Sequence, residues 1–78
     1  MRQGKKVLTY TVIIQPDDGA FSVHFPDVPG CFSDGDTYEE ALENAKVALE
    51  EHLASLRDYG KPIPEPKSRA TAISVTTC

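Results

Sequence analysis

One amphipathic helix pattern, set between β-strand patterns, most constrains how this chain can fold. Thr37 and Glu40 form a capping box, and Gly60 followed by Pro62 is the signal at which a helix ends. The pattern therefore predicts a helix over residues 38–59. At 100° per residue, its packed stripe is expected to contain Tyr38, Leu42, Ala45, Leu49, Leu53 and Leu56. A single helix covers only one face of a sheet, so the other face is expected to stay open.

Strand patterns lie on both sides of this helix. Residues 6–15 and 20–25 carry alternating apolar side chains and are joined by a turn rich in Pro, Asp and Gly, which predicts a β-hairpin. Residues 31–33 follow a proline-containing turn as a short third strand, and residues 69–75 form a fourth. The expected fold is α+β, in the order β-β-β-α-β. It has an antiparallel three-stranded meander, one crossover strand, and the helix on one face.

The alternation also predicts which side chains each sheet face carries. The face beneath the helix is expected to hold Leu8, Tyr10, Val12, Phe21, Val23, Phe25, Ile73 and Val75. The open face is half apolar, which suits a contact between subunits, and its candidate contact residues are Thr9, Thr11, Ile13 and His24. A chain of 78 residues has a thin core. We therefore expect a single domain over residues 1–78 that forms a homodimer or a higher even-numbered oligomer.

The charge balance argues against nucleic acid as a direct partner. The chain has 8 Lys and Arg against 12 Asp and Glu, a net charge of −4 and a pI of about 4.9, which opposes a phosphate backbone. No stretch has the roughly 18 apolar residues of a membrane span, and the first residues lack the apolar segment of a signal peptide, so a cytoplasmic protein is expected. Cys31 and Cys78 are too few for a disulfide framework and are expected to be free thiols.

Four motifs together resemble the HicB-like antitoxin family. They are the strand at residues 21–25, the turn that follows it, the capped Glu-Glu-Ala start of the helix, and the Gly-Lys-Pro-Ile-Pro loop after the helix; the turn consists of Pro26, Asp27, Val28, Pro29, Gly30 and Cys31. The resemblance covers roughly residues 10–66 and implies a degenerate ribonuclease-H-like fold. It also implies the role of antitoxin in a type II toxin–antitoxin pair. The implied partner is a small basic toxin that cleaves messenger RNA and is blocked by direct contact. Many members continue into a DNA-binding domain, and operator binding is not expected of a sequence that ends at Cys78.

Candidate partner-binding residues lie on the helix and just before it. Four acidic residues are expected on its solvated side, where they would steer a basic toxin: Asp36, Glu39, Glu43 and Glu50. A solvated helix face without a partner is the competing interpretation. The turn residues Pro26, Asp27, Pro29, Gly30 and Cys31 are interpreted as a rigid connection in which Asp27 caps nearby N–H groups, with a recognition loop as the alternative.

No catalytic, cofactor-binding or metal site is expected. Asp27, Asp34 and Asp36 invite comparison with metal-dependent nucleases, whose ions need several converging carboxylates. The predicted first, second and fourth strands contain no acidic residue, however, so we expect a protein that is not an enzyme. The alternative to an antitoxin is an orphan structural or regulatory oligomer that has the same fold but no toxin partner.

Overall fold

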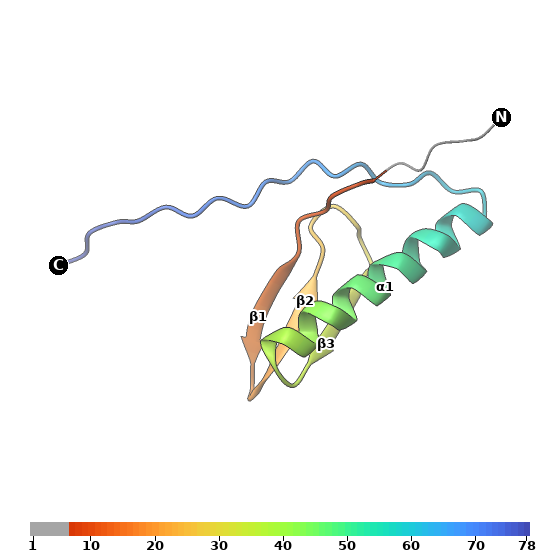
Figure 1. The fold of residues 1–78 in the computed structure, drawn as a ribbon. Coiled ribbons are helices and arrows are strands. Elements are labelled where there is room, and N and C mark those ends of the chain that lie inside the picture. The colour runs from red at the N-terminus through yellow and green to blue at the C-terminus, as the bar shows by residue number, and fades with distance from the viewer. Residues whose placement is uncertain (1–6) are drawn as a thin grey trace.

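The structure is a computed structural model that describes residues 7–78 as three strands followed by one long helix (Figure 1). The elements are β1 (Ile13–Asp17), β2 (Ala20–His24), β3 (Phe32–Gly35) and α1 (Tyr38–Asp58). The strands form one antiparallel sheet in the order β1-β2-β3, and α1 packs on one face of it, mainly against β3 and β2. The α+β class, the three-stranded meander and the single helix on one face are therefore confirmed.

The hairpin between β1 and β2 turns through only two residues. Asp17 pairs with Ala20, and the intervening Asp18 and Gly19 have φ angles of 55° and 88°. Two successive positive φ angles are typical of a type I′ turn, whose twist matches that of the paired strands. The turn is shorter than predicted, because Pro16 and Asp17 belong to β1.

The first strand begins later than the predicted span of residues 6–15. Its ladder starts opposite His24, and residues 7–12 pair with no strand in the part of the chain that the structure describes. The reason is that β2 ends at His24, because the turn that begins at Pro26 leads the chain away from the ladder. Lys6, where the predicted strand began, lies outside the described residues.

The signals that delimit α1 act close to the way the sequence predicts. The hydroxyl of Thr37 accepts a hydrogen bond from the N–H of Glu40 at 3.1 Å. In return, the Glu40 carboxylate accepts from the N–H of Asp36 at 2.6 Å, one residue before the position that a capping box would use. At the other end, Gly60 has a φ of 70° and donates its N–H to the carbonyl of Arg57 at 3.0 Å. Both termini thus satisfy backbone groups that the helix itself leaves unpaired.

The core is small and lies between α1, the sheet and the turn after β2. Its buried side chains are Val23, Phe25, Val28, Cys31, Ala41 and Ala45. The predicted helix stripe is wrong at Tyr38 and Leu42, which are 50% and 45% exposed, because Ala41 and Ala45 face the sheet instead. The cause is Gly35, where a Cβ atom would lie only 2.7 Å from the Cα of Ala41. Helix and strand approach so closely here that only small residues fit.

The prediction of a fourth strand within this domain is wrong. Residues 69–78, which we call the tail, form no strand and run away from the sheet (Figure 1). Ile73 and Val75 were expected beneath the helix but are 78% and 77% exposed. The tail makes the molecule 60 Å long, against 27 and 20 Å in the other two directions. A strand needs a ladder partner, and the direction of the tail takes it away from all three strands.

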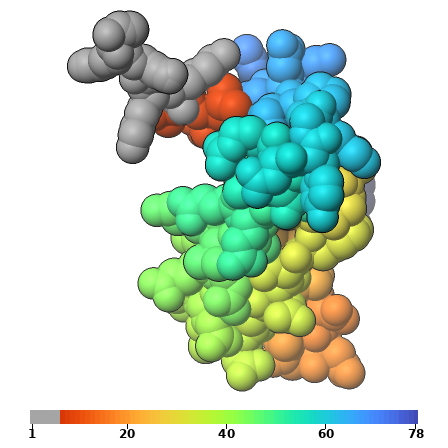
Figure 2. All heavy atoms as spheres, turned by 90° about the vertical axis from the view of Figure 1, so that its right-hand side faces the viewer, coloured from red at the N-terminus to blue at the C-terminus, as the bar shows by residue number. Residues whose placement is uncertain are grey.

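The remaining side chains beneath the helix follow the prediction more closely. Tyr10, Val12 and Phe21 are half-buried against the core, whereas Leu8 is 37% exposed at its margin. The space-filling view shows the end of α1 and the segment that follows it gathered at one end of the molecule, with the β1–β2 hairpin at the other (Figure 2). Within residues 7–78, no helix has both the length and the hydropathy needed to cross a membrane.

Candidate partner-binding surfaces

The four carboxylates predicted to meet a partner are all exposed. Glu39, Glu43 and Glu50 project from one flank of α1, and Asp36 lies just before the residue that caps it. At 1.5 Å per residue, the three glutamates span about 16 Å along the helix axis. We call these four residues the acidic row. The placement of Asp36 and Glu39 near the helix N-terminus also suits the helix dipole, which stabilises negative charge there.

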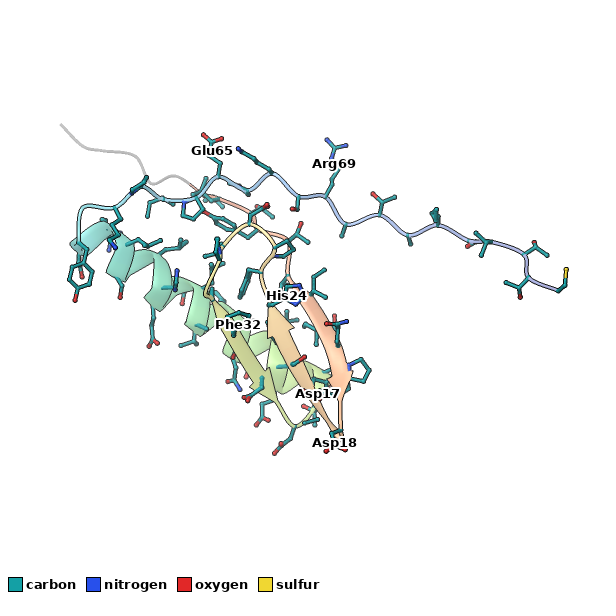
Figure 3. The ribbon with its side chains drawn as sticks, turned by 180° about the vertical axis from the view of Figure 1, so that it is seen from behind. Asp17, Asp18, His24, Phe32, Glu65 and Arg69 are labelled. Carbon is teal, nitrogen blue, oxygen red and sulfur yellow. The ribbon has the colours of Figure 1, made fainter. Side chains whose placement is uncertain are left out.

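The open sheet face brings three side chains into one row across the strands. Ile13, His24 and Phe32 occupy paired positions on β1, β2 and β3. His24 and Phe32 lie together at the end of the sheet opposite Asp17 and Asp18 of the hairpin tip (Figure 3). Phe32 is 69% exposed and is not among the residues predicted at this surface. Side chains along a strand alternate between its two faces, so a buried Cys31 would have indicated that the neighbouring Phe32 is exposed.

The other two residues predicted on this face lie outside the sheet. Thr9 and Thr11 precede β1 and do not belong to the cross-strand row. The Thr11 hydroxyl donates a hydrogen bond to the carbonyl of Ser68 at 2.8 Å, so it already has a partner within the chain. The structure therefore brings Ile13 and His24 together on the sheet, whereas the two threonines lie in the segment that precedes β1.

The turn between β2 and β3 is a rigid connection. The N–H of Val28 donates to the carbonyl of Phe25 at 3.1 Å, and the N–H of Cys31 donates to the carbonyl of Val28 at 3.2 Å. Gly30 supplies a φ of 84°, and the Val28 side chain, 1% exposed, fills the core beneath the turn. Burial raises the pKa of the Cys31 thiol, which disfavours the reactive thiolate.

Asp27 in this turn holds a distant segment rather than its own neighbours. Its carboxylate accepts hydrogen bonds from the N–H of Ser68 at 2.6 Å, the hydroxyl of Ser68 at 2.8 Å and the N–H of Lys67 at 2.8 Å. These bonds, with that from the Ser68 N–H the strongest influence, hold the pKa of Asp27 below its ordinary value of 3.8. Nearby, the Tyr10 hydroxyl donates to the carbonyl of Pro64 at 2.6 Å. Desolvation, and then the charge of Asp27, raise the pKa of Tyr10. We call the contacts of Asp27 the Asp27 anchor.

The three aspartates compared with a nuclease site do not converge in the structure. In the described range 7–78, no three His, Cys, Asp or Glu side chains come close enough together to hold a metal ion. Asp27 faces residues 67 and 68, Asp34 lies in β3, and Asp36 precedes the helix. Of these three carboxylates, that of Asp27 is taken up by its hydrogen bonds to residues 67 and 68.

Comparison with known proteins places these features in a family. The family model described as HicB-like antitoxin of bacterial toxin–antitoxin system matches residues 10–76. The UPF0150 protein Ta0767 of Thermoplasma acidophilum is 39% identical over 67 residues, covering 85% of this chain and 97% of that protein. Antitoxin HicB 1 of Photorhabdus laumondii is 39% identical over 62 residues, covering 78% of this chain but only 40% of that antitoxin.

A solved structure extends the comparison to the fold. The HicA3 and HicB3 toxin–antitoxin complex contains a chain that superposes with a TM-score of 0.68 at 33% sequence identity, covering 77% of this chain and 70% of that chain. The family model spans the sheet, the rigid turn, the helix and most of the segment that follows. On this sequence and structural agreement, the chain belongs to the HicB-like antitoxin family.

Proposed function

We propose that this chain is an antitoxin that neutralises a small basic, messenger-RNA-cleaving toxin by direct contact, through binding rather than catalysis. The observation that carries the proposal is the similarity to a chain of the HicA3–HicB3 toxin–antitoxin complex, at a TM-score of 0.68 and 33% identity. A cytoplasmic location is part of the proposal, because the messenger RNA that such a toxin attacks is found there. Any homo-oligomer would act in the same compartment.

The acidic row is the proposed contact for the toxin. A protein that binds RNA presents basic surface, and the carboxylates of Glu39, Glu43 and Glu50 form an exposed negative strip along α1. Charges at such a strip act over about 8 Å at physiological ionic strength and mainly raise the association rate. The open sheet face with Ile13 and His24 is the second surface available for contact.

A salt series of association rates tests this contact. The assay takes as the toxin a small basic protein found by inspecting the adjacent reading frame, and the variant carries Glu43→Lys with Glu50→Lys. At low salt, association should slow by about tenfold, while the circular dichroism spectrum stays that of the wild type because both residues are exposed. A matched control carries Asp17→Lys with Glu65→Lys, which makes the same change in net charge at exposed sites off the helix (Figure 3).

The possible outcomes separate the two surfaces. A control that slows as much as the variant would mean that net charge matters and the acidic row does not. Equal rates for variant and wild type would place the contact elsewhere, and the open sheet face around Ile13 and His24 would be tested next. A chain that binds no toxin, in pull-down from native lysate and with the purified neighbour, would contradict the proposal.

A second candidate function is an orphan structural or regulatory oligomer. It is favoured by the relative Ta0767, of which this chain covers 97%, whereas it covers 40% of Antitoxin HicB 1. The family thus includes proteins of about the length matched here. The same pull-down distinguishes the two functions, because only an antitoxin retains a basic partner.

A further inference from the structure

The outer edge of β1 offers backbone groups for another strand. In a hairpin with a two-residue loop, the closing pair Asp17–Ala20 is hydrogen-bonded, and alternate residues along β1 then direct their N–H and C=O groups outward. These outward residues are Ile14 and Pro16. Pro16 has no N–H to offer, so the free donors lie at Ile14 and beyond it toward the start of the strand.

The other edge of the sheet is partly covered by the helix. The same alternation directs the backbone of Phe32 and Asp34 away from β2 on the outer side of β3. There the carbonyl of Asp34 accepts a hydrogen bond at 2.9 Å from the side-chain amide of Asn44 in α1. Among residues 7–78, no helix side chain is bonded to β1 in this way. An added strand would therefore join the sheet at β1.

Apolar surface lines the side of the molecule on which β1 lies. Because α1 packs mainly on β3 and β2, the flank of the helix toward β1 is only partly covered, and Leu42 is 45% exposed. A groove of about 460 Å³ continues this flank, and its apolar lining includes Leu8, Tyr10, Leu49 and Leu53. A strand placed beside β1 would direct every second side chain toward this apolar corner.

The tail has the pattern that such a strand requires. Thr71, Ile73 and Val75 alternate with Ala72, Ser74 and Thr76, so one side of an extended tail is apolar and the other small and polar. Ile73 and Val75 are the most exposed large aliphatic side chains after residue 60, at 78% and 77%. Ten residues of extended chain reach about 33 Å, which is more than the length of β1.

The tail is directed away from β1 of its own domain. Residues 67 and 68 are held by the Asp27 anchor, and the chain continues outward from there (Figure 1). To lie beside its own β1, the tail would have to bend toward the sheet just after Ser68, because the tail and β1 diverge from there (Figure 1). Residues 69–73 contain no Gly, Pro, Asn, Asp or Ser, the residues that favour turns. The edge and the tail are therefore complementary, but they do not pair within one copy in this structure.

We infer that two copies of this chain exchange tails. Residues 70–76 of each copy add to the β1 edge of the other as a fourth strand, with Ile73 and Val75 on the side of the partner's helix flank. The exchange is reciprocal, so in one two-fold symmetric dimer each β1 edge pairs with a strand and each tail has a ladder partner. The partner of this surface is thus a second copy of the chain, and of the acidic row only Glu50 lines the groove beside this contact.

The mass of the full chain in solution tests the inference. Light scattering over a concentration series should give twice the 8.5 kDa of one chain. Ile73→Asp with Val75→Asp should raise the dimer dissociation constant by at least about a hundredfold, because each exchanged strand loses two buried aliphatic side chains. The control, Ser74→Asp with Thr76→Asp, places the same charges on the other side of the strand and should remain dimeric. Both variants should keep the helical circular dichroism signal of the wild type, since Ile73 and Val75 are exposed in the single chain.

Crosslinking shows which copy receives the tail. In a Cys78→Ser background, Gln15→Cys and Ser74→Cys would lie on the same sheet face, within reach of a short bismaleimide, while Cys31 stays buried. Exchange gives a covalent dimer. A crosslinked monomer, a monomeric wild type, or a control that dissociates as readily as the Ile73 and Val75 variant would each overturn the inference. Loss of toxin binding would leave these results unchanged, so the two proposals fail independently.

Discussion

Replacing Gly35 with alanine should destabilise the domain through one steric conflict. Gly35 does not have a positive φ, so its backbone conformation alone accepts alanine, and such a change usually stabilises by restricting the unfolded chain. Here the new methyl group would meet the main chain of α1, 2.7 Å from the Cα of Ala41 and 2.9 Å from the carbonyl carbon of Glu40. These are backbone atoms of a capped helix and cannot rotate away.

The size of the effect follows from these contacts. Overpacking a core costs about 1–3 kcal/mol, and a conflict with backbone belongs at the upper end of that range, about 3 kcal/mol. A domain of 78 residues has a total stability of roughly 4–12 kcal/mol. The melting temperature should therefore fall by roughly 12–24 °C.

Urea unfolding followed by far-ultraviolet circular dichroism measures this loss. Asp34→Ala, at an exposed side chain on the same strand, should change stability by no more than about 0.5 kcal/mol. Combining Gly35→Ala with Ala41→Gly should give no rescue, because the conflict is with main-chain atoms rather than with the Ala41 methyl group. Wild-type stability of the single variant, or recovery in the double variant, would refute the steric argument.

Three further predictions concern the anchor, the thiols and the helix cap. Asp27→Asn should speed hydrogen exchange of the Ser68 amide, because that amide donates to the Asp27 carboxylate. In the wild type, the protection of this amide from exchange should be complete above pH 3.8. It should disappear as the pH falls through the lowered pKa of Asp27, since the ionised carboxylate is the favoured acceptor. A thiol reagent should label Cys78 at once and Cys31 only on unfolding, because Cys31 is buried and its pKa is raised. Thr37→Ala should lower the free energy of unfolding by about 1 kcal/mol in a urea titration.

Local signals predicted most of the fold. The cap at Thr37, the end at Gly60 and the alternation in β2 depend on residues within a few positions of one another, and each predicts the element that the structure contains. The predicted helix stripe is wrong at Leu42, because helical periodicity favours large apolar side chains and contains no information on the strand that the helix packs against. The absence of a side chain at Gly35 selects alanines for the contact, and that choice is visible only in three dimensions.

Long-range contacts limited the prediction of the site. Asp27 was assigned to capping near itself, but its partners lie 40 and 41 positions away in sequence. The exposure of Phe32 depends on its pairing opposite His24, which requires the strand register. The acidic row needed neither kind of information, since helical periodicity alone places Glu39, Glu43 and Glu50 on one flank.

The hydrogen bond between Asn44 and Asp34 also bears on solubility. A small sheet with two free edges can add copies on both sides, and such growth has no natural end, which is the route to fibres. Because the side chain of Asn44 takes up the Asp34 carbonyl at the β3 edge, strand addition is favoured at the β1 side of the sheet. An assembly built by strand pairing at β1 alone ends with the dimer. The amide of one helix residue would thus separate a protein of defined size from an open-ended polymer, and Asn44→Ala should favour aggregation of an otherwise folded domain.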